Sequence, residues 1–86
     1  MQTANCTLGV SSQFDSPNPS VGDHIYRENS TVTCTVTSPV YVGEYQLDCV
    51  GWVGTGSVPT TGADISVAFT ITENSTITWI WEGGGP

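Results

Sequence analysis

Three cysteines are the side chains in this 86-residue sequence whose type and spacing point most directly to chemistry. Cys34 and Cys49 each alternate with apolar residues, so both thiols should face the core, from two strands that a hairpin would join. We therefore predict a Cys34–Cys49 disulfide, which would close a loop of about 15 residues and stabilise the fold by roughly 3 kcal/mol. Such a bond requires an oxidising compartment, and the alternative is a cytosolic protein with three buried thiols. Cys6 lies on the apolar side of its own alternating segment, which favours a buried thiol over an intermolecular bridge.

Three tryptophans are the candidate ligand-binding residues. Flat aromatic rings can stack on sugars, so Trp52, Trp79 and Trp81 could form a carbohydrate-binding surface. The competing interpretation is a core role, because Trp79 and Trp81 alternate with Ile77 on one face of a strand. We favour the core and expect Trp79 to be buried against the strand at residues 65–71. Two exposed, coplanar rings would favour carbohydrate binding instead.

Catalytic and metal-binding patterns are missing from the sequence. His24 is the one histidine, and it lies in a Gly-Asp-His turn without a nucleophile nearby in the sequence. The cysteines have no zinc-type spacing, and the acidic residues follow no calcium-loop pattern. We therefore expect no enzyme, no bound metal and no cofactor.

Three asparagines fit the N-glycosylation pattern Asn-X-Ser/Thr: Asn5, Asn29 and Asn74. In a chain this rich in Thr and Ser the pattern also arises by chance, so both interpretations stay open.

The charge balance excludes several partners. Arg27 is the one lysine or arginine in the sequence, and the formal net charge is −7. Without a basic patch, nucleic acid and anionic membrane surfaces are poor partners. The sequence also contains no apolar run near the roughly 20 residues that a membrane-spanning helix needs. The absence of lysine excludes crosslinking through lysine amines.

Alternating apolar and polar residues predict the secondary structure. No segment has apolar residues at helical spacing, so we expect no substantial helix. The alternation instead predicts five strands, near residues 4–11, 31–37, 41–53, 65–72 and 76–81. One apolar face on each strand indicates an all-β domain, which would be a small antiparallel sheet folded on itself or a sandwich. Residues 1–86 are expected to form this single domain, with a Gly-rich, linker-like tail at residues 83–86.

The N-terminal segment, residues 1–15, is a candidate for self-assembly. Ala4, Cys6, Leu8 and Val10 form an apolar side that could complete the sheet of a neighbouring copy. The alternative is that this strand pairs within its own domain.

Several short motifs from residue 16 onward occur together in one known repeat. They are Ser-Pro-Asn-Pro-Ser-Val-Gly (16–22), Ser-Thr-Val-Thr-Cys (30–34), Cys-Val-Gly-Trp (49–52), Gly-Thr-Gly-Ser-Val-Pro (54–59) and Glu-Asn-Ser-Thr-Ile-Thr-Trp-Ile-Trp (73–81). In this combination the chain resembles the divergent internalin B-repeat-like domains of large bacterial surface and secreted proteins. The resemblance is poorest at residues 1–15. It implies a small β-rich module, often in tandem, with spacer, adhesive or assembly roles and no catalytic activity.

These observations lead to one expected function and one alternative. We expect an extracellular or cell-surface structural module of a bacterial protein, which assembles with copies of itself as a filament or tandem array. The alternative is an adhesive module that binds glycans through exposed aromatic rings.

Overall fold

The structure is a computed structural model that describes residues 4–14 and 17–83. Within these residues the regular elements are β-strands and no helix occurs. The strands are β1 (Asn5–Ser12), β2 (Gly22–Arg27), β3 (Ser30–Thr35), β4 (Val40–Val42), β5 (Tyr45–Thr55), β6 (Thr61–Gly62), β7 (Ser66–Ile71) and β8 (Ser75–Gly83). The all-β prediction is therefore confirmed.

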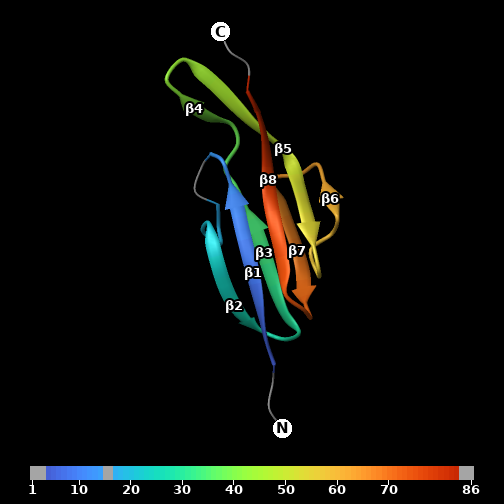
Figure 1. Cartoon of the computed structure of the whole chain (residues 1–86). Coiled ribbons are helices and arrows are strands. Elements are labelled where there is room, and N and C mark those ends of the chain that lie inside the picture. The colour runs from blue at the N-terminus through green and yellow to red at the C-terminus, as the bar shows by residue number, and fades with distance from the viewer. Residues whose placement is uncertain (1–3, 15–16, 84–86) are drawn as a thin grey trace.

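The strands form two sheets (Figure 1). The large sheet has the order β2-β1-β8-β5-β4, and the short β6 pairs with β5. The small sheet contains β3 and β7, which run antiparallel. Most neighbours in the large sheet are antiparallel, but β1 and β8 run parallel. The first and last strands of the domain are thus direct neighbours that point the same way.

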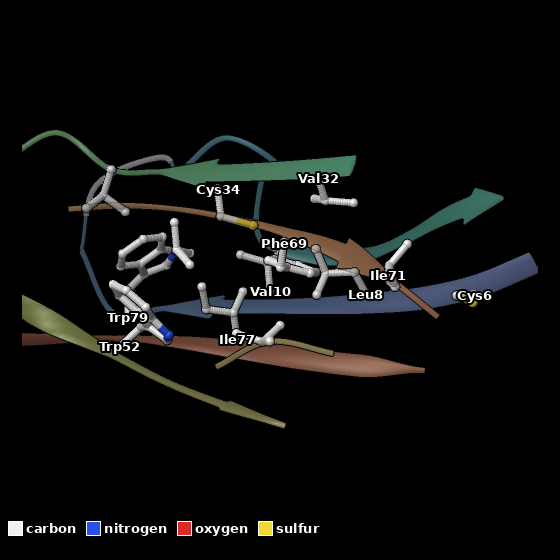
Figure 2. Packing of buried hydrophobic residues seen from close by; sticks show 13 residues of the cluster. Cys6, Leu8, Val10, Val32, Cys34, Trp52, Phe69, Ile71, Ile77 and Trp79 are labelled. Carbon is white, nitrogen blue, oxygen red and sulfur yellow. The ribbon is translucent and has the colours of Figure 1, made fainter. Parts of the chain in front are cut away.

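The core lies between the inner faces of the two sheets (Figure 2). Apolar residues alternate with exposed Thr, Ser and Ala residues along β3 and β7, as the sequence predicted. The buried apolar residues are Cys6, Leu8, Val10, Val32, Cys34, Val36, Trp52, Val58, Val67, Phe69, Ile71, Ile77 and Trp79. Both faces of this core come from short alternating strands, which is how a chain of this size builds a two-layer domain.

The predicted strand at residues 41–53 is two strands joined by a tight hairpin. Val42 pairs with Tyr45, and the two residues between them make the turn. Gly43 has a φ of 63°, a left-handed conformation that glycine adopts without a steric penalty. A β-bulge then interrupts the pairing of β5 with β8 between Cys49 and Gly51.

The N-terminal strand belongs to its own sheet. β1 lies between β2 and β8, with residues 5–10 paired to β2 and residues 8–12 paired to β8. Cys6, Leu8 and Val10 are buried in the core of the same domain, while Ala4, next to the strand, is exposed. The expectation that this strand is offered to a neighbouring copy is therefore corrected. Its apolar alternation serves the domain's own core. Residues 1–3 and 15 of the predicted 1–15 segment, and 84–86 of the Gly-rich tail, lie outside the described residues.

The loop after β5 closes one side of the sandwich. Val58 from this loop is buried, and the indole N–H of Trp52 donates a hydrogen bond to the carbonyl oxygen of Pro59 at 3.2 Å. The backbone N–H of Gly54 donates to the carbonyl oxygen of Thr60 at 2.8 Å. The loop backbone thus packs directly against β5, and glycines make this close approach sterically feasible.

Candidate interaction surface at the open end of the sandwich

The three cysteines are thiols, and the predicted Cys34–Cys49 disulfide is not formed. Both residues do face the core, as expected, but they come from different sheets. Cys34 pairs with Val67 in the small sheet, whereas Cys49 pairs with Trp81 in the large sheet. The expected hairpin does not exist, because the chain crosses from one sheet to the other between β3 and β4. The Cys49 thiol instead contacts the carbonyl oxygen of Gly51 at 3.5 Å, and Cys6 is buried as predicted.

Burial raises the pKa of the Cys34 thiol to about 11, because the thiolate would lose its hydration in the core. Burial and the neighbouring Cys34 also raise the pKa of Tyr26. The unfolded chain releases the Cys34 proton near its ordinary pKa of about 8.5, and the folded chain does not.

This difference predicts an alkaline loss of stability. The contribution of Cys34 is fully present below about pH 8.5 and disappears as the pH rises towards 11, a loss of about 3 kcal/mol. Urea unfolding at a series of pH values should show this decline. The Cys34→Ala variant should show a shallower decline, because it removes the Cys34 titration and the part of the Tyr26 pKa shift that Cys34 causes. Equal slopes for the two proteins would contradict the prediction.

The tryptophans do not form a carbohydrate platform. Trp52 and Trp79 are both buried, as the core interpretation predicted. Their rings meet edge to face, with centroids 5.9 Å apart and an interplanar angle of 68°. Trp81 is half-buried, its ring packs edge to face with Phe14, and its indole N–H donates to the Ser12 hydroxyl at 2.9 Å. These residues lack the exposed, coplanar rings that stacking on sugars requires, so the alternative site is corrected.

The remaining candidate residues are scattered over the surface. His24 lies on β2, and a ring nitrogen contacts the Ser20 carbonyl oxygen at 2.6 Å. The three sequon asparagines, Asn5, Asn29 and Asn74, are all exposed. Asn29 adopts a φ of 72° in the turn before β3, and the Asn74 side-chain oxygen accepts a hydrogen bond from the backbone N–H of Thr7. Each of these contacts fixes a local turn or strand end, and no two of the residues form a common site.

Apolar side chains from several strands gather on the inner face of the large sheet beyond the end of the small sheet. We call this surface the overhang, and it consists of Val40, Val42, Tyr45, Leu47, Cys49 and Trp81. The pairing of β4 with β5 and of β5 with β8 places these side chains on the same face of the large sheet. Figure 1 shows the β4–β5 hairpin extending past the ends of β3 and β7.

The overhang becomes more exposed towards its tip. Trp79, at its inner border, is 2% exposed, whereas Tyr45 and Val42 are 46% and 50% exposed. Ile65, the residue before β7, has 43% of its surface exposed although its alternation matches the buried residues of that strand. In the part of the chain that the structure describes, this end of the sandwich therefore exposes apolar side chains of both sheets.

Sequence reasoning missed the overhang as a site. It predicted that Cys49 faces the core but did not predict that this face of the strand extends beyond the small sheet. The two-residue turn at Gly43 was the signal for a hairpin, because glycine there is typical of tight connections between alternating strands.

Comparison with models of protein families, with curated protein sequences and with solved structures returned no match. Within the described residues no ligand-sized pocket and no cluster of potential metal ligands occurs. The same residues contain no helix that is long and apolar enough to cross a membrane.

Proposed function

We propose that this chain is a structural module of a bacterial extracellular or cell-surface protein, and that copies of it are arranged in series. The observation that carries this proposal is the parallel pairing of the first and last strands. Leu8 of β1 lies beside Ser75 at the start of β8, and Ser12 lies beside Trp79. β8 then continues to Gly83, which pairs with Leu47 on the overhang. The chain therefore enters the large sheet at one end and leaves it at the other.

The shape of the molecule supports the same role. Its principal extents are 57, 19 and 14 Å, and its radius of gyration is 13.9 Å. A compact domain of this length would have a radius of gyration of about 12 Å. An elongated module whose chain enters and leaves at opposite ends separates whatever is attached to it, which is the mechanical requirement for a spacer.

Composition and resemblance support the location and the absence of catalysis. The net charge of −7 and the many exposed Thr and Ser residues suit an extracellular surface module. The motifs of residues 16–81 resemble a repeat that is often found in tandem. We propose no catalytic role, no cofactor, no nucleic-acid partner and no membrane insertion.

The serial arrangement predicts how length increases with copy number. A single chain that contains two copies in succession should have a maximum dimension about twice the 57 Å extent of one copy, because each copy contributes its long axis. Small-angle X-ray scattering of the one-copy and two-copy chains measures this directly. A two-copy chain that is hardly longer than one copy would mean that the modules fold back on each other. That result would contradict the spacer role.

A further inference from the structure

The parallel pairing of β1 with β8 runs along the long axis of the molecule (Figure 1). Residues 8–12 of β1 lie beside residues 75–79 of β8, and we call this pairing the terminal ladder. β1 begins at Asn5, before the ladder, and β8 ends at Gly83, beyond the other end of the ladder. A pull on the chain from both of its ends therefore draws β1 and β8 in opposite directions along their own axes.

This direction of pull loads the hydrogen bonds of the terminal ladder together. The bonds of a ladder run between the strands, so a force along the strand axes acts on all of them at once. A force across the strands would instead open the bonds one after another from one end. Unfolding under force depends on the barrier to unfolding, and this barrier is higher when several bonds must break in the same step.

Side-chain hydrogen bonds lengthen the terminal ladder at both of its ends. In front of the ladder, the side-chain oxygen of Asn74 accepts a hydrogen bond from the backbone N–H of Thr7 at 2.9 Å. At the other end, the indole N–H of Trp81 donates to the Ser12 hydroxyl at 2.9 Å. Each bond joins β1 to β8 or to the residue that precedes β8, so both bonds must also break when β1 slides along β8.

The core holds β1 against the same movement. Leu8 and Val10 are 0% and 3% exposed, and β1 also pairs with β2 on its other side. A slide of one residue, about 3.3 Å, is not repaired by pairing in a new register, because successive side chains of a strand face opposite sides. Sliding β1 therefore removes hydrogen bonds and core contacts in one step.

We infer that the terminal ladder is a mechanical clamp, which keeps this domain folded under tension applied along the chain. Tension that enters at the start of β1 passes directly to β8 through the ladder, without first separating the two sheets. The inference rests on the serial arrangement proposed above, since a module in series carries the load of its neighbours. It adds a load-bearing function to that arrangement, because a spacer can keep two parts of a protein apart without resisting a pull.

Two directions of pull on the same domain provide the test by single-molecule force spectroscopy. Glu73 is exposed and lies close before β8, and the natural chain contains no lysine, so Glu73→Lys introduces one side-chain amine for attachment. The first pull holds this variant at both ends of the chain, and the second holds it at the N-terminal end and at position 73. The second pull acts across the terminal ladder and opens it from the pair of Leu8 and Ser75.

The end-to-end pull should leave the domain folded for longer. At equal constant force we expect a lifetime at least about thirtyfold longer than for the pull at position 73, which corresponds to two more hydrogen bonds that break in the same step. Because one variant serves for both pulls, its equilibrium stability is the same in the two measurements.

Two further variants test whether the terminal ladder carries the load. Asn74→Ala removes the acceptor for the Thr7 N–H, so its lifetime under the end-to-end pull should fall about fivefold. Ser57→Ala is the matched control, because the Ser57 hydroxyl accepts a bond of the same kind from the backbone N–H of Thr72 at 2.8 Å, outside the ladder. A bond that is still intact when the clamp breaks does not change the unfolding rate, so this lifetime should stay unchanged. Circular dichroism establishes that the variants are folded.

The outcomes separate the clamp from the serial role. Equal lifetimes for the two directions of pull would overturn the clamp, and so would equal effects of Asn74→Ala and Ser57→Ala. Either comparison decides the inference by itself if a variant of the other does not fold. The scattering of the two-copy chain judges the serial role independently, because it measures length without any applied force.

Discussion

Trp79→Ala should remove most of the stability of this domain. The side chain is 2% exposed, belongs to the core and packs edge to face with Trp52. Truncation of a buried tryptophan to alanine costs about 3–5 kcal/mol through lost burial and the cavity that remains. Small domains have a total stability of about 5–15 kcal/mol, so the variant should be largely unfolded at moderate urea concentrations. Urea unfolding followed by circular dichroism measures the difference.

Trp79→Phe is the matched control for this prediction. The indole N–H of Trp79 is buried and has no hydrogen-bond partner in the described structure. Phenylalanine removes this unsatisfied donor, whose burial costs about 1–3 kcal/mol, and keeps an aromatic ring against Trp52. We therefore expect a loss of less than about 2 kcal/mol for Trp79→Phe. A loss below about 1 kcal/mol for Trp79→Ala would show that the ring is not part of the core.

Gly51→Ala should be the most damaging change of a single methyl group. A Cβ atom at Gly51 would overlap the carbonyl oxygen of Gly62 and lie 2.9 Å from the Cα atom of Ala63. Both neighbours are backbone, so the segment that carries β6 would have to move away from β5. The φ of Gly51 is 135°, which alanine adopts only with strain. The sum of strain and overpacking is expected to be about 3–5 kcal/mol.

Gly22→Ala separates the cost of backbone strain from the cost of overpacking. Gly22 has a similar φ of 123°, but a Cβ atom there would have nothing within 4 Å. The free energy of unfolding of this variant should therefore fall only by the cost of backbone strain, about 1–2 kcal/mol. Chemical unfolding of both variants gives the difference, which measures the close approach of the backbone around Gly62. Equal losses for the two variants would mean that the contact between β5 and β6 is loose.

The alternation of the sequence determined which side chains face the core. It predicted the strands that became β1, β3, β7 and β8, and it predicted the burial of Trp79. This information is local, because a strand turns successive side chains to opposite faces wherever it pairs. For the same reason the inward direction of both Cys34 and Cys49 was predicted correctly.

Alternation did not determine which strands pair, and the wrong predictions follow from this. A hairpin between the strands of Cys34 and Cys49 was the simplest connection along the sequence, but the chain crosses to the other sheet between them. The apolar side of β1 suited a neighbour's sheet as well as its own, and the parallel pairing with β8 joins segments at opposite ends of the sequence. Such pairing depends on how all strands share one core, and no local pattern contains that information.

The overhang shows most clearly what alternation predicts and what only the packing of the sheets decides. The residues on its inner face were recognisable as apolar and inward-facing from the sequence. Whether a second layer covers them depends on where β3 and β7 end relative to β5 and β8, which is a property of sheet register and packing. The sequence by itself determined that this face is apolar, and only the tertiary structure decided that it extends beyond the small sheet, because this depends on the relative lengths and placement of the two sheets.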